Sequence, residues 1–443
     1  MRTESLTADA VSVRAIGETM PLERFSMLYV TREKFPGYRV DLTELYSAGL
    51  AGRGHRIDWV MQSSEAGPAR IERLGPGERV FVGAAGAGTG VLAKALNLVR
   101  GLMQDMSVWR LARAGRYDFI QVRDKHVAGL IGLWAARTRK IPFFFWMSFP
   151  FADADLYRVS EFKDDYPLSY RIFCKIRGHL TGWLLYRVIL PRADHIFVQS
   201  ERMQRDVAAH GIAPAKMTPV PMGISLAGVR DARIDAAQDP RLRGRWPVVY
   251  VGTLKRMRRL DFLIEAFRLV HEREPRAILI MVGDAAPEEM QFLHAEVQKR
   301  DLAEHVVFTG LLPRDEAWAY IRAARVCVSP FRPSPILDST SPTKVVEYLA
   351  LGQPVVANDH PDQAKVLAES GAGLAVPYEP EAFAHAIIEL LHDEKRAQAM
   401  GRRGQDYVAR YRSYEYLTGC LEQKYRELLG QRGASALAEE SAI

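Results

Sequence analysis

A lysine and a glutamate three residues apart, Lys344 and Glu347, are the side chains of this 443-residue chain best suited to chemistry. They lie in the segment STSPTKVVEYLALGQPVVAN, residues 339–358. Ser341 is a favoured N-cap and Pro342 suits the first helical position, so a helix is predicted to begin here with unpaired backbone N–H groups. Lys344 would be its third residue, where a cation opposes the helix dipole by about 0.3–1 kcal/mol. An anionic ligand at this end would reverse that cost.

This helix is apolar on most of its sides, which predicts that it is largely buried. Its apolar residues are Val345, Val346, Tyr348, Leu349 and Ala350. One hypothesis assigns Lys344 and the helix N-terminus to a diphosphate, and assigns Glu347 to the hydroxyls of a ribose, which a carboxylate accepts in a fixed geometry. The alternative is an ion pair worth about 0.2–0.5 kcal/mol. We favour the first, because a surface ion pair does not account for the apolar surroundings.

A second group of candidates follows a glycine turn at Gly252, in VVYVGTLKRMRRLDF. Four cations, Lys255, Arg256, Arg258 and Arg259, cluster where a buried strand is expected to end. Such a cluster is suited to neutralising the phosphates of a leaving group, which is electrostatic catalysis without proton transfer. For any single one of these residues, an exposed basic helix start is the simpler interpretation.

Short apolar runs alternate with segments of helical period along the whole chain, which predicts strand-helix-strand units and a parallel sheet. The fold class is therefore α/β, with two doubly wound, Rossmann-like domains that face each other across a cleft. The expected divisions are a disordered start (1–22), an N-terminal domain (23–225), a linker (226–246), a C-terminal domain (247–406), a return helix (407–430) and a flexible tail (431–443). In such sheets, ligands bind beyond the carboxyl ends of the strands.

Four segments, SPTKVVEYLALGQPVVAN, VVYVGTL, FTGLLPRDE and PVPMGIS, together resemble the family-4 glycosyltransferases of the two-domain type called GT-B. The resemblance covers most of residues 195–430, and the N-terminal half matches only in layout. It implies a retaining hexosyl-type enzyme that moves a sugar from a nucleotide diphosphate sugar, held by the C-terminal domain, to an acceptor held by the N-terminal domain. It implies no cofactor and no essential metal, and a final helix that crosses back.

The resemblance also implies residue roles on the donor side. It places the ribose-binding glutamate on Glu347 and the phosphate-binding loop on Ser341, Pro342, Thr343 and Lys344. The pair of basic residues that holds the diphosphate falls on Thr253 and Arg258, so the first cation is replaced here, and Lys255 or Arg256 is the expected substitute. We assign catalytic roles to Arg258 and Lys344.

Three further donor-side positions come from the same resemblance. Gly310 matches a turn near the nucleotide base, and Gly283 matches a turn at a strand end. Ser339, next to Asp338, stands where the family has a second glutamate that contacts the donor sugar. On the acceptor side, we expect Gly37 in the loop after the first strand, together with Asp124, His126 and Ser148. A histidine common in the family is absent from Trp146-Met147-Ser148, and a lone histidine such as His126 is more often a cap or surface residue.

Charge and composition narrow the partners. Residues 1–225 hold 31 Lys and Arg against 22 Asp and Glu, whereas residues 226–443 hold 29 against 31. Basic residues alternate with large apolar ones in LVRGLMQDMSVWRLARAGRY and YRIFCKIRGHLTGWLLYRVIL, which favours contact with an anionic membrane; a solvated helix face is the alternative. The expected partners are a nucleotide sugar and a glycan or lipid-linked acceptor, as in surface polysaccharide assembly. No nucleic-acid-reading module is recognised.

The expected location is the cytoplasm, at the inner face of the cytoplasmic membrane. The first 24 residues lack a secretory signal, and the longest apolar stretch, Ile141–Ala152, is too short to span a bilayer. Three cysteines without a partner motif indicate neither a disulfide framework nor a zinc site. Two alternatives stay open: a nucleotide-sugar epimerase of the same fold, and a catalytically silent scaffold that binds nucleotide sugars.

Overall fold

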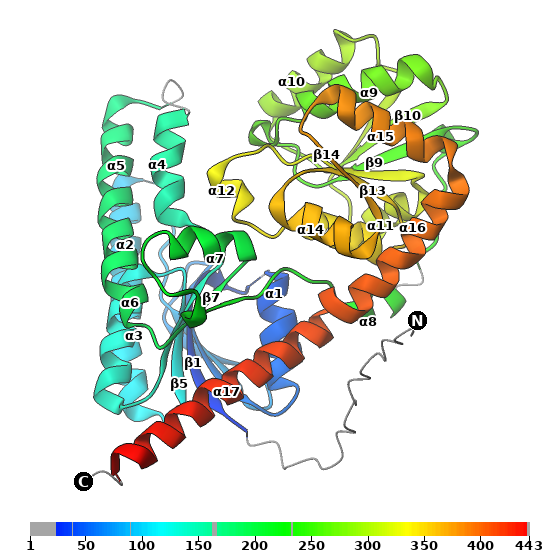
Figure 1. Ribbon diagram of the computed structural model, residues 1–443. Helices are drawn as coiled ribbons and strands as arrows, with labels where there is room; N and C mark the ends of the chain where they lie inside the picture. The colour runs from blue at the N-terminus through cyan, green and yellow to red at the C-terminus, as the bar shows by residue number, and fades with distance from the viewer. Residues whose placement is uncertain (1–23, 38, 89, 162–165, 232–233, 441–443) are drawn as a thin grey trace, which may run out of the picture.

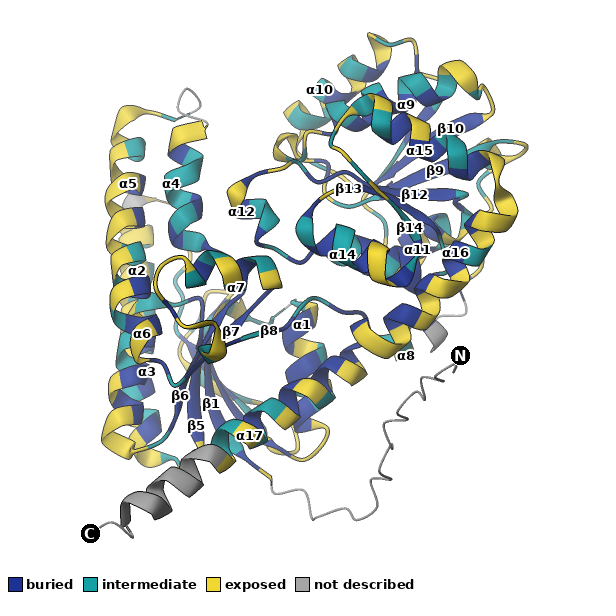
Figure 2. Ribbon diagram, in the orientation of Figure 1, coloured by how far each residue is buried: buried dark blue, intermediate teal, exposed yellow. Residues whose placement is uncertain are grey.

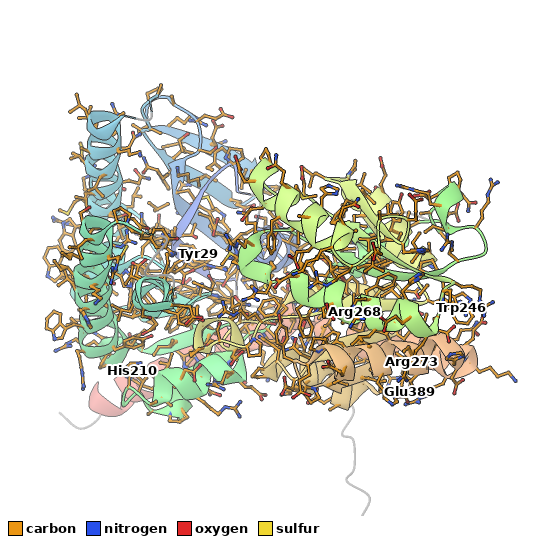
Figure 3. The ribbon with its side chains drawn as sticks, turned by 90° about the horizontal axis from the view of Figure 1, so that it is seen from above. Tyr29, His210, Trp246, Arg268, Arg273 and Glu389 are labelled. Atoms are coloured by element: carbon orange, nitrogen blue, oxygen red, sulfur yellow. The ribbon has the colours of Figure 1, made fainter. Side chains whose placement is uncertain are left out.

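The computed structural model describes residues 24–37, 39–88, 90–161, 166–231 and 234–440, which form two α/β domains and a long C-terminal helix (Figure 1). The segment 1–22, expected to be disordered, lies outside the described residues, as do residues 441–443. Buried residues follow the strands of both sheets (Figure 2), so each domain has its own core. Seen from above, Tyr29 lies inside the first domain and Trp246 lies toward the far side of the second (Figure 3).

The first domain is built on eight strands in the order β3-β4-β2-β1-β5-β6-β7-β8, all parallel to their neighbours except β3 to β4. Strands β5 (Phe119–Arg123) and β6 (Phe143–Met147) are buried along their whole length, as a parallel sheet covered on both faces requires. The other strands are β1 (Ser26–Phe35), β2 (Arg56–Ser63), β3 (Arg70–Gly75), β4 (Glu78–Gly83), β7 (His195–Val198) and β8 (Met217–Pro219). The helices are α1 (Val40–Leu42), α2 (Val91–Ala114), α3 (His126–Arg139), α4 (Phe151–Glu161), α5 (Leu168–Trp183), α6 (Leu190–Arg192) and α7 (Glu201–Ala208), with π-helical turns at Thr43–Ala51 and Leu184–Ile189.

The second domain has six parallel strands in the order β11-β10-β9-β12-β13-β14. Alternate residues of β10 (Ala277–Val282) enter the two apolar clusters on opposite faces of the sheet, so the sheet is covered on both faces. The other strands are β9 (Trp246–Val251), β11 (Val306–Gly310), β12 (Val326–Ser329), β13 (Val355–Asn358) and β14 (Gly373–Val376). The helices are α9 (Asp261–Arg273), α10 (Pro287–Gln298), α11 (Arg314–Ala323), α12 (Pro335–Asp338), α13 (Thr343–Ala350), α14 (Pro361–Ser370), α15 (Pro380–His392) and α16 (Glu394–Tyr407). The predicted α/β class with two doubly wound domains is confirmed.

Two segments connect the domains. The expected linker contains helix α8 (Leu226–Asp231) and a 3₁₀ turn at Pro240–Leu242. The return helix, expected over residues 407–430, is observed as α17 (Tyr414–Glu440) after a π-helical turn at Val408–Arg412, and it continues through residues 431–440, where we expected a flexible tail. It crosses from the second domain to the first (Figure 1). In the part of the chain that the structure describes, no helix combines the length and apolar character that crossing a bilayer requires.

The first half of α17 is part of the core of the first domain. Its residues Tyr414, Leu417, Leu421 and Tyr425 pack in one apolar cluster with strands β1, β2 and β5. The Tyr425 hydroxyl donates to Gln121 Oε1 at 2.6 Å and lies 3.2 Å from the Tyr46 hydroxyl. The C-terminal helix therefore stabilises a domain to which it does not belong in sequence.

We predict that Tyr425→Ala lowers the free energy of unfolding by about 3–5 kcal/mol, because it removes a fully buried ring. Tyr425→Phe keeps the ring and leaves Gln121 without one partner, so its cost should be about 1–3 kcal/mol. Urea denaturation followed by tryptophan fluorescence measures both. Equal stability of the alanine variant and the native chain would contradict the role of α17 in this core.

Candidate active site

At the carboxyl end of strand β9, Lys344 of helix α13 lies over Gly252. Gly252 has φ +149°, and a Cβ built there would lie 2.6 Å from Lys344 Cε, so a side chain at this position would displace the lysine. Lys344 Nζ donates to the Tyr250 hydroxyl at 2.6 Å and lies 4.0 Å from the centroid of the Tyr250 ring. The lysine is thus held over the strand end by one ring and one glycine.

This environment makes the charged form of Lys344 costly. Burial lowers the pKa of Lys344 well below its usual value, the nearby Arg258 lowers it further, and Glu347 opposes both. A second negative group beside the amine would restore the charged form, because an opposite charge within a few Å favours ionisation. The arrangement therefore suits an anionic ligand.

Helix α13 begins differently from the prediction. Its N-cap is Pro342 without a side-chain cap, Thr343 is the first helical residue, and Lys344 is the second. The prediction of Ser341 as N-cap was wrong: its hydroxyl donates to Asp362 Oδ2 at 2.7 Å and accepts from the Met222 backbone N–H at 3.0 Å. The first N–H groups of α13 are therefore left without a side-chain acceptor.

Glu347 lies one helical turn after Lys344, partly buried on α13. Burial raises the pKa of its carboxyl, while Lys344 and Arg314 lower it. Its carboxylate forms no hydrogen bond or ion pair with any residue that the structure describes. A partly buried carboxylate without such a partner is available to a ligand's hydroxyls.

Three glycines at neighbouring strand ends lie next to this pair. Gly283 N–H donates to Gly310 O at 3.1 Å, and a Cβ at Gly283 would lie 2.0 Å from Gly252 O. No side chain fits at Gly283 without moving the backbone. The ends of β9, β10 and β11 therefore approach one another backbone to backbone, and of these three glycines Gly252 contacts Lys344.

The four cations of the basic turn after β9 lie in different places. Arg258 is half-buried, 5.0 Å from the centroid of the Phe331 ring, and close enough to act on the pKa of Lys344. Thr253 and Lys255 are exposed. Arg256 and Arg259 instead line a cavity of about 700 Å³ between the domains, whose other wall includes α4. Of the four predicted cations, the structure therefore brings Arg258 to Lys344.

Ser339 faces the other domain. It is buried, its hydroxyl donates to Asp206 and lies 3.3 Å from Pro335 O, and its carbonyl accepts from the Ser200 hydroxyl at 2.7 Å. Asp206 and Ser200 belong to α7 and its cap in the first domain. The residue that replaces the second glutamate thus joins the two domains.

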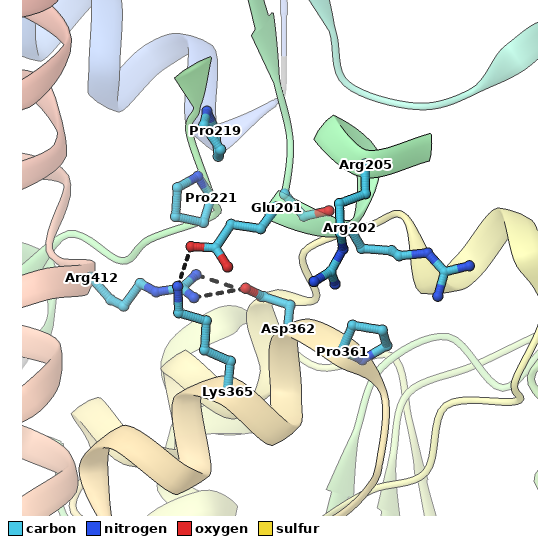
Figure 4. A pocket seen from close by; sticks show the side chains of 10 residues that line it. Glu201, Arg202, Arg205, Pro219, Pro221, Pro361, Asp362, Lys365 and Arg412 are labelled. Atoms are coloured by element: carbon cyan, nitrogen blue, oxygen red, sulfur yellow. Dashed lines mark hydrogen bonds and ion pairs between the residues drawn. The ribbon is translucent and has the colours of Figure 1, made fainter. Parts of the chain in front are cut away.

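Further contacts hold the domains together around a pocket of about 220 Å³ (Figure 4). We call this junction, formed by Glu201, Asp362, Lys365 and Arg412, the hinge. Arg412, nearly fully buried, donates to Asp362 Oδ1 at 2.7 Å, and Lys365 pairs with Glu201 across the domains. The Ser341 hydroxyl bonds to the same Asp362 carboxylate. The loop that leads into α13 is therefore fixed by the hinge.

In the first domain, the buried residues Asp124 and Ser148 form a pair. Asp124, at the end of β5 with φ +56°, accepts hydrogen bonds from the Ser148 N–H at 2.9 Å and from its hydroxyl. Burial and Arg32 lower the pKa of His126, the first residue of α3, to about 4, so its imidazole is neutral at physiological pH. Gly37 lies apart from them, next to Met61 and Lys34.

Sequence reasoning missed Arg123, which lies beneath this pair. It is fully buried, and its Nη2 donates to Asp41 Oδ2 at 2.6 Å. Burial alone would raise the pKa of Asp41, but Arg123 and Arg39 outweigh it and lower that pKa to about 2. The signal was an arginine at the end of the otherwise uncharged strand FIQVR.

In the described ranges, no three His, Cys, Asp or Glu side chains gather closely enough to hold a metal ion.

Two family models match the chain: "Glycosyl transferases group 1" over residues 233–407 and "Glycosyl transferase 4-like domain" over residues 37–223. The chain is 28% identical over 265 residues to the GDP-mannose-dependent alpha-(1-6)-phosphatidylinositol monomannoside mannosyltransferase of Mycobacterium tuberculosis, covering 57% of this chain and 68% of that protein. It is 24% identical over 291 residues to the alpha-monoglucosyldiacylglycerol synthase of Streptococcus pneumoniae, covering 63% of this chain and 60% of that protein. Sucrose-phosphate synthase from Thermosynechococcus elongatus shares the fold, with a TM-score of 0.69, 20% identity, and coverage of 92% of this chain and 100% of that one.

We predict that Lys344→Met raises the free energy of unfolding at pH 7, because burial and Arg258 lower the pKa of this lysine in the folded chain. The folded-state pKa lies below the unfolded-state pKa, so the unfolded chain gains the proton first as pH falls, and the native lysine destabilises the fold at pH 7. The difference in unfolding free energy between the variant and the native chain should become smaller from pH 7 to pH 9.5. Denaturant titrations at both pH values measure it; a less stable variant at pH 7 would contradict the depressed pKa.

Proposed function

The chain belongs to the family-4 glycosyltransferases of the two-domain GT-B type, and we propose that it transfers a hexosyl group from a nucleotide diphosphate sugar to a lipid-linked acceptor with retention. The observation that carries the donor assignment is the amine of Lys344, held with a depressed pKa over bare backbone at a strand end. A desolvated cation beside unpaired helix N–H groups is suited to a diphosphate. The relative in M. tuberculosis is named a mannosyltransferase, and the relative in S. pneumoniae is named a monoglucosyldiacylglycerol synthase.

We assign the diphosphate to Lys344, Arg258, the Ser341–Thr343 loop and the first N–H groups of α13. The free carboxylate of Glu347 binds the ribose hydroxyls, since a carboxylate accepts two such hydrogen bonds. The backbone at Gly252, Gly283 and Gly310 admits the nucleotide at close range. Lys255 and Thr253 flank this site from the exposed turn.

In the reaction, the bond between the anomeric carbon and the phosphate oxygen breaks, and the bonding electrons leave with the nucleoside diphosphate. Lys344 and Arg258 stabilise the charge that develops on the departing oxygen. The acceptor hydroxyl attacks on the same face and gives its proton to that oxygen, which retains the anomeric configuration. Because these cations neutralise the leaving group, we propose that no metal ion is required.

The acceptor meets the first domain. The pair Asp124–Ser148 and the neutral imidazole of His126 are the polar groups that would orient its hydroxyl, and Gly37 lies separately in the loop after β1. The names of two relatives, a phosphatidylinositol monomannoside mannosyltransferase and an alpha-monoglucosyldiacylglycerol synthase, support a lipid acceptor for this chain. We propose the cytoplasmic face as the location, and no nucleic acid as a partner.

The transferase and its alternatives differ in products. Incubation with a panel of nucleotide sugars should release free nucleoside diphosphate only when a glycolipid acceptor is present. An isomerised donor would identify an epimerase, which no relative reported above supports. Binding without turnover would identify a silent scaffold, in keeping with Ser339 facing the other domain.

We predict that Lys344→Ala lowers the rate of transfer by about 10²-fold or more, the scale of losing one group that stabilises transition-state charge. Lys299→Ala, which removes an exposed lysine after α10, is the matched control and should transfer at the native rate. Initial rates of nucleoside diphosphate release measure both. A Lys344→Ala enzyme with near-native activity would remove this lysine from the site.

A further inference from the structure

One side of the first domain is unusually apolar for a surface. Of the twenty-two exposed large apolar side chains in the described ranges, fifteen lie on α2, α3 and α5. They are Leu92, Leu96, Leu98, Val99, Leu102, Met103, Met106, Val127, Trp134, Leu168, Ile172, Phe173, Ile176, Leu180 and Trp183. These helices lie along one edge of the molecule in both views (Figures 2 and 3). An exposed patch of this extent marks an interaction surface.

The exposed residues form stripes along the helices. On α5, residues 168, 172, 176, 180 and 183 recur every three or four positions, which places them on one face. The side chains of Ile176, Leu180 and Trp183 are 63%, 61% and 60% exposed. On α2, residues 92, 96, 99, 103 and 106 recur in the same way. Trp134 of α3 stacks on Trp109 of α2, with the ring centroids 3.6 Å apart.

The charge of these helices is strongly positive. Together α2, α3 and α5 contain nine Lys and Arg and one acidic residue. That residue, Asp105, is buried and paired with Lys125, so no carboxylate of these helices faces outward. Exposed cations such as Lys175 and Arg113 lie beside the apolar stripes. An apolar face bordered by cations is the pattern of a helix that lies in the headgroup region of an anionic bilayer.

We propose that the outer faces of α2, α3 and α5 dock this protein on an anionic lipid bilayer, with the axis of α5 lying along the membrane surface. The charge argues against a second copy as the occupant, because two such faces would bring like charges together. The apolar stripes add a contribution that salt does not screen. The docking surface is therefore defined by these three helices and by their shared charge.

The surface is connected to the cleft by a helical hairpin. Helix α4 packs against α5, and Arg177 of α5 pairs with Asp155 of α4 at 2.7 Å. Helix α4 also contributes Tyr157 and Arg158 to the 700 Å³ cavity between the domains. Only this step rests on the proposed function: docking through α5 brings a membrane-borne acceptor beside the cleft.

The test is co-sedimentation with vesicles of phosphatidylcholine containing phosphatidylglycerol, at low and high salt. We expect the native chain to sediment with these vesicles more than with phosphatidylcholine alone, and to keep part of its binding at high salt. Ile176→Glu with Leu180→Glu should bind about tenfold more weakly or worse. Ile71→Glu with Leu74→Glu adds the same charge at exposed apolar positions of β3 and should bind as the native chain does. A milder variant, Lys175→Glu, should lose mainly the part of the binding that salt screens.

Native-like vesicle binding by the α5 variant would overturn the proposal. The proposal would also be overturned if the native chain does not bind vesicles and forms a dimer, and the α5 variant is a monomer. Donor binding by the same variants separates this proposal from the transferase assignment. Vesicle binding without sugar transfer would leave the surface standing and overturn the activity, whereas transfer to a detergent-dispersed acceptor without vesicle binding would do the reverse.

Discussion

The active-site account depends on one desolvated amine. Lys344 lies over Gly252 and against Tyr250, where burial and Arg258 lower the pKa of the amine. A lysine with a lowered pKa destabilises the folded chain, because a buried charge without a partner is unfavourable. A negative ligand beside the amine would remove this cost. The bare backbone at Gly283 and the free carboxylate of Glu347 provide room and a second anchor for the rest of that ligand.

The hinge determines where this amine lies relative to the other domain. Arg412, at the end of the π-helical turn before α17, bonds to Asp362, which also holds Ser341 at the start of the α13 loop. Ser339 bonds to α7 of the first domain. The loop that leads into α13 is thus held by contacts to both domains, so the position of Lys344 depends on how the two domains are joined.

The sequence predicted the two-domain α/β fold and the position of Lys344 and Glu347 one turn apart on the same helix, because apolar periodicity and residue spacing are local properties. It failed where tertiary contacts outweigh local preference. Ser341 has the chemistry of an N-cap, yet its hydroxyl has better partners in Asp362 and Met222. The edge strand β3 reads RIERLG, which is too polar to stand out as a strand, and its identity comes from pairing with β4. The division of the basic turn between site and cavity depends on a single turn of 3₁₀ helix, which no spacing rule determines.

The most direct test of the central claim is calorimetric titration of the protein with a nucleoside diphosphate at a series of pH values from 7 to 10, in buffers of different ionisation enthalpy. The account predicts that binding takes up protons, because the diphosphate restores the charge of Lys344, and that Lys344→Met abolishes this uptake. Binding of equal affinity to both proteins, without proton uptake by the native one, would contradict it.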